Sequence, residues 1–255
     1  MTIVAIFNQK GGVGKTTTSL NLAAALARGG LETICIDLDP QSQLSDISGV
    51  TPKSGDDTVL SMFERNRPLH ELMHKTDSGF SVIPAHSALS KVDALYAKSY
   101  NVVNRLNASL RGEKFGGNGT AVVIDCSPLI GVLSLNAIFA CDFILIPVAA
   151  DHLSAKGAIK LEHTLKALEP ILKRRIDRRY LLTRFDSRRR MGWDVLHLLE
   201  ESFGKEVCRT SIAESVSLAE SPALHKTVFE HAPTSRGAHD YDDLLAELEA
   251  GGLIK

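Results

Sequence analysis

The sequence predicts an α/β protein, with a mostly parallel, doubly wound sheet and helices on both faces. Short apolar runs alternate with longer segments whose apolar residues recur at helical spacing. The runs are apolar at consecutive positions, as expected for parallel strands that are buried on both faces. A glycine-rich turn, KGGVGKTT at residues 10–17, joins the first run to the first helical segment. At 255 residues the chain is long enough for one such domain.

In the N-terminal half, the run Ile3–Phe7 predicts a strand over residues 2–8. A helix over 15–28 follows, with a stop at Gly29-Gly30. The next apolar run predicts a strand over 33–37, and the Ser-, Asp- and Gly-rich residues 42–57 predict a mobile loop with one short helix. Beyond it we expect helices over 59–64 and 69–74, a strand over 80–84, a helical stretch over 87–111 and a loop over 112–119.

The C-terminal half continues the alternation. Residues 121–125 form the clearest buried strand, and Leu161, Leu165 and Leu168 mark one face of a long helix. The expected elements are strands over 121–125, 143–148, 180–183 and 206–211 and helices over 133–140, 154–173, 190–203 and 235–250. We find no repeat, low-complexity segment or linker, so residues 1–255 are expected to form a single domain.

Composition excludes several classes of protein. With 44% apolar residues, 23% charged residues and a net charge of −1, the chain has no global attraction to nucleic acid. No apolar run approaches the roughly 18 residues of a membrane span, and the N-terminus enters a strand without the basic leader of a signal peptide. The four cysteines are scattered without a C-x-x-C pair, which is typical of buried thiols in a reducing cytoplasm.

The glycine-rich turn is a candidate phosphate-binding loop, because it lies between a strand and a helix and matches G-x-x-x-x-G-K-T. Glycines let successive backbone N–H groups point into one concavity, to which the helix N-terminus adds partial positive charge. Lys15 can reach the β- and γ-phosphates, and the Thr16 hydroxyl is the expected Mg²⁺ ligand. The alternative is a glycine-rich turn without a ligand. The expected nucleotide-binding residues are Lys10, Gly11, Gly12, Val13, Gly14, Lys15, Thr16 and Thr17.

Two segments that carry carboxylates lie at the ends of buried strands. Asp125 closes an apolar run in a Walker B pattern, whose carboxylate holds Mg²⁺, usually through water. Asp37 and Asp39 end the second strand in the run D-L-D-P-Q. Parallel strands end at one edge of a sheet, so these carboxylates are expected near the phosphate loop.

Lys10, at the start of the loop, is surplus to the ordinary motif. With it the chain resembles the deviant Walker A class, the ParA/MinD family of P-loop ATPases. The resemblance implies that Lys10 crosses a homodimer interface to the phosphates of the partner's ATP, that Asp39 positions or activates the attacking water, and that Asp37 supports the hydration shell of the metal. Lys10, Lys15 and Asp39 would then be catalytic, and Thr16, Asp37 and Asp125 would form the Mg²⁺ site. The alternatives are a solvated lysine at position 10 and an Asp39 that only begins a turn before Pro40.

The resemblance covers nearly the whole chain. Residues 125–137 resemble the family's D-C-P-P…L-N-A segment, with Ser127 in place of a proline, and residues 181–186 resemble the strand end that borders the adenine pocket. Residues 218–222 and 232–238 are more similar to ParA than to MinD. The glycine-flanked cysteines of iron–sulfur relatives are missing, and the acidic last segment differs from MinD's basic membrane helix. The chain begins at the first strand, so we expect no N-terminal helix-turn-helix domain. Because the acidic last segment would be repelled by anionic lipid, we expect no membrane binding.

The resemblance also implies non-specific DNA binding by the ATP dimer. Arg188, Arg189 and Arg190 stand where the family carries a DNA-contacting arginine. A second basic stretch, residues 173–175 and 178–179, begins with Lys173 and Arg174 and includes Arg178. Against this, residues 213–217 have lost both arginines of a P-R-N-V-R-like family stretch. The alternative is a solvated charged face.

The leading hypothesis is a cytoplasmic, nucleoid-associated ATPase that partitions or positions a DNA locus or a protein assembly and is stimulated by a ParB-like or other partner. Two rivals remain: a metabolic P-loop ATP-dependent ligase or phosphotransferase, for which Lys10 would have no obvious purpose, and a non-hydrolysing DNA-binding module. A match to the zinc motif H-E-x-x-H, His70 to His74, has no clear third ligand and is expected to be a surface helix.

Overall fold

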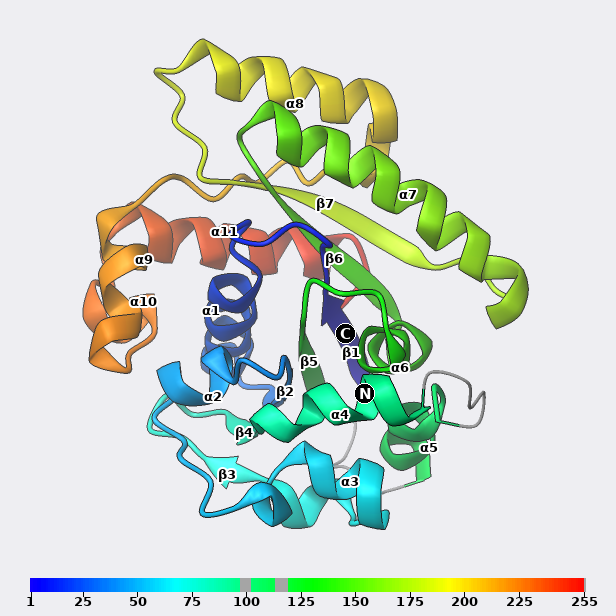
Figure 1. Cartoon of the computed structure of the whole chain (residues 1–255). Coiled ribbons are helices and arrows are strands. Elements are labelled where there is room, and N and C mark those ends of the chain that lie inside the picture. The colour runs from blue at the N-terminus through cyan, green and yellow to red at the C-terminus, as the bar shows by residue number, and fades with distance from the viewer. Residues whose placement is uncertain (97–101, 113–118, 255) are drawn as a thin grey trace.

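A seven-stranded sheet with the order β3-β4-β2-β5-β1-β6-β7 forms the centre of the computed structural model (Figure 1). The model describes residues 1–96, 102–112 and 119–254. All neighbouring strands are parallel except β3 and β4, which are antiparallel. The mostly parallel α/β fold is therefore confirmed. The strands are β1 (Thr2–Ile6), β2 (Glu32–Leu38), β3 (His74–Lys75), β4 (Ser81–Ile83), β5 (Thr120–Cys126), β6 (Phe143–Ala149) and β7 (Asp177–Thr183).

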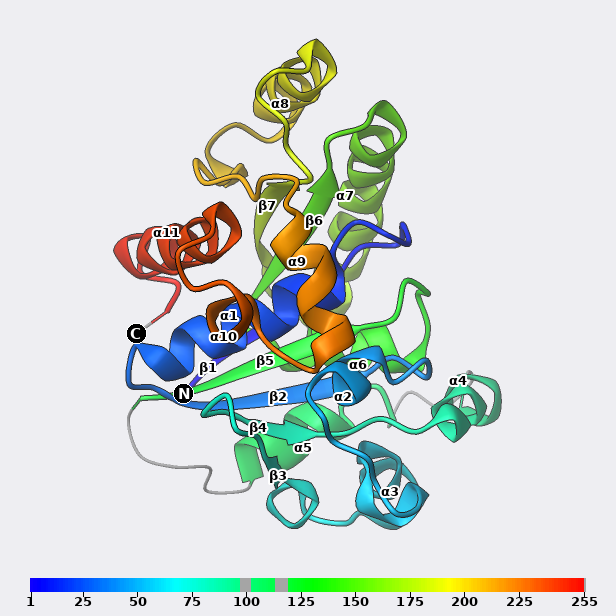
Figure 2. The same ribbon diagram turned by 90° about the vertical axis from the view of Figure 1, so that its left-hand side faces the viewer.

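Helices cover both faces of the sheet, and β1 shows why its strands are apolar throughout. Ile3 and Ala5 belong to the core on one face, whereas Val4 and Ile6 belong to the core on the other. On the Val4 face lie α1 (Lys15–Arg28), α10 (Val228–His231) and α11 (Arg236–Ala250), as Figure 2 shows for α1 and α11. The opposite core includes side chains of α3 (Val59–Arg65), α4 (Ser90–Tyr96), α5 (Arg105–Gly112), α6 (Val132–Ala140), α7 (His152–Leu172) and α8 (Arg190–Phe203). The short helices α2 (Gln43–Ile47) and α9 (Val216–Glu220) complete the set in the described part of the chain.

The helical stretch predicted over 87–111 is not one helix. Its described parts are a 3-10 turn at Ser87–Leu89, α4, and α5, which begins only at Arg105; residues 97–101 lie outside the description. In Figures 1 and 2, α4 and α5 occupy different places under the sheet. The Leu106 amide donates to the Asn136 side chain in α6, at 3.0 Å, which fixes the start of α5 by a tertiary contact. Most of the loop predicted over 112–119 also lies outside the described residues.

Two further predictions are wrong. The helix predicted over 69–74 is a 3-10 turn at Leu69–Leu72, and His74 already belongs to β3, so His70 and His74 share no helix face. Among the described residues, no group of three or more His, Cys, Asp or Glu side chains could hold a metal ion. The strand predicted over 206–211 touches β7 only through a bridge between Val207 and Tyr180.

Glu247 of α11 explains the missing strand. The backbone N–H groups of Arg209 and Thr210 both donate to its carboxylate, each at 2.7 Å, whereas the flanking Cys208 and Ile212 amides donate to carbonyls of β7. None of the helices in the described structure is long and apolar enough to cross a membrane. The four cysteines are free and buried, as predicted.

Candidate functional site

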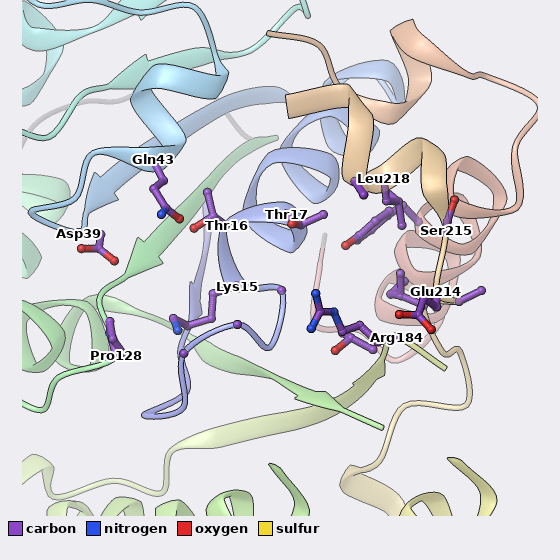
Figure 3. A pocket seen from close by; sticks show the side chains of 18 of the residues that line it. Lys15, Thr16, Thr17, Asp39, Gln43, Pro128, Arg184, Glu214, Ser215 and Leu218 are labelled. Carbon is purple, nitrogen blue, oxygen red and sulfur yellow. The ribbon is translucent and has the colours of Figure 1, made fainter. Parts of the chain in front are cut away.

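The site lies at the carboxyl ends of the parallel strands, where the loops after β1, β2, β5 and β7 converge on one cavity of about 470 Å³. Figure 3 shows Lys15 and Asp39 toward one end of this cavity and Arg184, Glu214 and Leu218 toward the other. Such a volume is in the range of small-molecule sites. The lining residues are Gly11, Gly12, Gly14, Lys15, Thr16, Thr17, Asp39, Gln41, Gln43, Pro128, Thr183, Arg184, Ile212, Ala213, Glu214, Ser215, Leu218, Ala219 and Tyr241.

The loop between β1 and α1 has the backbone that its glycines predict. Gly12 and Gly14 have φ angles of 73° and 86°, in the left-handed region that favours glycine. The Thr183 hydroxyl at the end of β7 donates to the carbonyl of the buried Val13, at 2.9 Å. The loop is thus held from both sides, with the open N-terminus of α1 facing the cavity.

Lys15 and Thr16 occupy the first turn of α1. The Lys15 ammonium donates to the Lys10 carbonyl at 3.1 Å, so its side chain spans the mouth of the loop. Burial lowers the pKa of Lys15, while Asp125 and Asp39 act in the opposite direction. An ammonium in this position can neutralise a phosphate oxygen that enters the loop.

Asp125 is fully buried at the end of β5. Its carboxylate accepts hydrogen bonds from the Thr16 hydroxyl at 2.9 Å and from the Ser19 hydroxyl at 2.7 Å. Burial raises its pKa to about 6 despite these donors. The Thr16 hydroxyl and the carboxylate are oxygen ligands of the kind that Mg²⁺ prefers, side by side at the phosphate end, so the residues fit that metal.

Asp37 lies opposite Asp125 in the strand register, but its carboxylate already accepts hydrogen bonds from its own loop. Its carboxylate accepts from the Ser45 amide at 2.9 Å, the Ser45 hydroxyl at 2.7 Å and the Asp39 amide at 3.0 Å. Burial, and then the charge of Asp125, raise its pKa to about 7. In the described structure Asp37 therefore organises the loop that carries Asp39. Asp39 itself lines the cavity, and its carboxylate accepts from the Gln41 amide at 3.0 Å.

The side chain of Lys10 points away from the cavity, toward the start of α7. Its ammonium donates to the two carboxylate oxygens of Asp151, at 2.8 and 3.1 Å, and to the Ser154 hydroxyl at 2.7 Å. Asp151 also caps the N-terminus of α7 by accepting from the Ser154 amide. Although partial burial acts the other way, hydrogen bonds from Lys10 and Ser154 lower the pKa of Asp151 to about 2. Lys10 is therefore an ion-paired residue at the rim rather than a freely solvated one.

The predicted DNA-binding run is exposed, and its charges are paired. Arg188 donates two hydrogen bonds to Asp186, at 2.9 and 3.0 Å, and the side chains of Arg188 and Arg190 are 86% and 94% exposed. Arg189 pairs with Asp186 and Glu214, and Arg190 lies 3.8 Å from Asp194. Since the three guanidinium groups are exposed, solvent screens these pairs and a phosphate could displace a carboxylate.

The second basic stretch is divided between the surface and the core, because Lys173 and Arg174 are exposed whereas Arg178 is buried. Lys173 ends α7 in an exposed left-handed turn, but Arg174 donates to the Cys141 carbonyl at 2.6 Å. Arg178 is only 1% exposed and pairs with Glu162 and Glu169 of α7.

Sequence reasoning missed three residues of the site. Ser19 lies one helical turn after Lys15, which is a spacing that could have identified it. Asp151 and Ser154 form a D-x-x-S helix start, also visible in the sequence, but nothing local connects them to Lys10. Arg184, which belongs to the segment 181–186 named in the sequence analysis, lines the cavity immediately after β7.

Comparisons with known proteins agree with this geometry. A family model described as an AAA domain matches residues 1–178. The chromosome-partitioning ATPase Soj of Thermus thermophilus is 37% identical over 248 residues, covering 97% of this chain and 95% of the relative. The chromosome partitioning protein ParA of Myxococcus xanthus is 34% identical over 251 residues, covering 96% of this chain and 87% of the relative.

Among solved structures, cobyrinic acid a,c-diamide synthase from Mycobacterium smegmatis with bound ADP and magnesium has a TM-score of 0.83 and 27% identity, covering 98% of this chain and 97% of that one. Together with the lysine pair of the loop and the buried carboxylate at the end of β5, these matches show that the chain belongs to the ParA/MinD family of P-loop ATPases.

Proposed function

We propose that this protein is an Mg²⁺-dependent ATPase that dimerises around two ATP molecules, binds DNA without sequence preference, and partitions or positions a cargo on the nucleoid. The observation that carries the proposal is the position of Lys10. It belongs to the phosphate loop, yet its ammonium is directed out of its own cavity and bound by Asp151 and Ser154. A lysine placed in this way is available to a second subunit.

In each subunit the loop amides and Lys15 would hold the β- and γ-phosphates. Thr16 would coordinate Mg²⁺, and Asp125 would hold a water of its shell. The metal supplies charge neutralisation when bound. Asp39 lines the same end of the cavity as Lys15 and would orient the attacking water. The ADP and magnesium named for the Mycobacterium smegmatis structure support this choice of ligands.

Lys10 would complete the partner's site. It would contact the phosphates bound by the partner subunit and stabilise the charge that develops in phosphoryl transfer. A cation supplied from a second protein is worth on the order of 10³ to 10⁵ in the rate of GTPases. To act in this way Lys10 must leave Asp151, so dimerisation and the loss of this ion pair are coupled.

DNA binding would use Arg188, Arg189 and Arg190, the exposed cations beside the site. Because Asp186, Asp194 and Glu214 pair with them, DNA phosphates must replace carboxylates that the protein already supplies. We expect affinities of roughly 10⁻⁴ to 10⁻⁶ M with a steep salt dependence. The two chromosome-partitioning relatives favour a DNA locus as the cargo. A ParB-like or other partner protein would stimulate hydrolysis.

The test is ATP turnover and sedimentation, with and without DNA, for the wild type, Lys10→Ala and Asp39→Ala. We expect Asp39→Ala to form the ATP dimer without turnover, and Lys10→Ala to lose both dimerisation and DNA-stimulated turnover. Lys160→Ala, an exposed lysine on α7, is the matched control and should behave as wild type. Normal turnover by Asp39→Ala would contradict the role of Asp39, and a Lys10→Ala protein that still dimerises and hydrolyses ATP normally would contradict the sandwich.

The likeness to a diamide synthase favours one alternative, a metabolic enzyme that uses ATP to activate a carboxylate. That enzyme would work with its own site and would not need Lys10. An ATP-bound monomer whose turnover is unaffected by Lys10→Ala and by DNA would support this alternative.

A further inference from the structure

The only tryptophan of the sequence is exposed on the surface that carries the arginine run. Trp193 lies at the start of α8, four residues after Arg189 and three after Arg190, and 43% of it is exposed. Tryptophan is highly buried on average in folded proteins, because its ring contributes a large apolar area. Exposed tryptophan and arginine side chains that lie together are typical of a surface that binds another molecule.

Two contacts hold the indole of Trp193 in place. Its Nε1–H group donates to the Ser187 carbonyl at 2.9 Å, and its ring meets the ring of Phe185 edge to face, with centroids 5.2 Å apart. Gly192 lets α8 approach Phe185 closely, because a Cβ atom there would lie 3.0 Å from the Phe185 ring. The indole is thus attached to the turn that carries the arginines, and it loses little conformational freedom when a ligand binds.

The indole and the arginines lie on the same side of α8. Residues three and four apart are neighbours on a helix, so Arg190, the first residue of α8, and Arg189, its N-cap, lie beside Trp193. The side chains of Arg189 and Arg190 are 63% and 94% exposed. Figures 1 and 2 show α8 at the outside of the molecule. This surface therefore combines charges that can bind phosphates with an aromatic ring beside them.

We propose that Trp193 stacks on an unpaired base of single-stranded DNA while the neighbouring arginines contact its phosphates. The inference rests on the proposed function, because it assumes that the arginine run binds DNA. In a duplex the neighbouring base pairs cover both faces of each base, whereas an unpaired base has a free face that an aromatic side chain can cover, whatever the sequence. Phosphate contacts alone carry no such information. Trp193 therefore makes this surface sensitive to whether the bases are paired.

The test uses the wild-type protein with Mg²⁺ and a non-hydrolysable ATP analogue. Because Trp193 is the only tryptophan, the intrinsic tryptophan fluorescence reports on this surface directly, and a stacked base quenches it. Three DNAs are compared: a short oligothymidine, an abasic strand of the same length and charge, and a duplex of the same length. We expect oligothymidine to quench the fluorescence, and we expect the abasic strand and the duplex to bind without quenching. Affinities are measured separately, from the anisotropy of a dye on the DNA.

Two variants test the size of the effect. Trp193→Leu removes the aromatic ring and should bind oligothymidine about 5- to 150-fold more weakly, with its affinity for the duplex unchanged. The unchanged duplex affinity also shows that the arginine turn is still folded. Trp193→Phe keeps a smaller ring and should lose only part of the affinity for oligothymidine. Met191→Ala is the control for the loss of an exposed apolar side chain, since Met191 is 50% exposed at the start of the same helix, and it should leave all affinities unchanged.

Three results would overturn the inference: oligothymidine that binds without quenching, an abasic strand that binds as tightly as oligothymidine, or a duplex that quenches equally. Failure of the proposed function is distinguishable from these results. A wild-type protein that binds none of the three DNAs, or an Arg188→Glu, Arg190→Glu double variant that binds all of them normally, would contradict the DNA surface itself.

Discussion

Replacing Asp151 with asparagine should strengthen the ATP dimer. Asparagine caps a helix about as well as aspartate does, so the start of α7 is kept, but it cannot form an ion pair with Lys10. The Lys10 and Asp151 side chains are 33% and 39% exposed, which limits the pair to about 1 kcal/mol after solvent screening. Because two such pairs are lost in a symmetric dimer, the variant should dimerise with a gain of up to about 2 kcal/mol, or about 30-fold.

The assay is sedimentation velocity at several protein concentrations with a non-hydrolysable ATP analogue. Asp242→Asn is the control, since Asp242 of α11 pairs with Arg28 at 2.9 Å on a surface that is more exposed, with side chains 47% and 50% exposed. Its dimerisation should equal that of the wild type. A dimer of Asp151→Asn that is no tighter than the wild type, at unchanged thermal stability, would refute the idea that this ion pair opposes assembly.

Three further outcomes are expected. Arg188→Glu with Arg190→Glu should abolish retention of the ATP dimer on DNA at low salt, whereas unchanged retention would move the DNA surface elsewhere. Burial raises the pKa values of Asp37 and Asp125 above the ordinary value near 4, so the folded protein binds these protons more tightly than the unfolded chain does. The free energy of unfolding without nucleotide should therefore fall as pH rises from about 4 to about 7. Asp37→Asn should flatten this dependence in urea titrations. Ser19→Ala removes a hydrogen bond to a buried carboxylate and should cost about 1–3 kcal/mol in the same titrations, a result that an unchanged midpoint would contradict.

Local signals were sufficient for much of the fold and for the phosphate end of the site. The apolar runs located the parallel strands, and because such strands end at one edge, Asp37 and Asp125 were expected near the loop before any coordinates were known. Glycine chemistry predicted the conformation of the turn.

The errors came from contacts between distant parts of the chain. Glu247 binds the amides of Arg209 and Thr210 and interrupts the pairing with β7 there, although the segment itself has the pattern of a strand. Arg178 has the sequence context of a surface cation, but the alternation of β7 turns it under α7 beside Glu162. The partner of Lys10 lies 141 residues away in sequence, which no local rule could connect.

One carboxylate holds both ends of the segment that carries Asp39. Asp37 accepts the Asp39 amide through one oxygen and the Ser45 amide and hydroxyl through the other, so the residues between them form a closed loop whose two attachments share a single charge. The Ser45 hydroxyl also accepts from the Ala85 amide just beyond β4, which ties this loop to the end of the strand that neighbours β2. If the hydrogen bonds at one end of this loop break, the Asp37 carboxylate is less firmly positioned, and its hydrogen bonds to the other end are weakened too. Asp39 and α2 should therefore open and close as one cooperative unit.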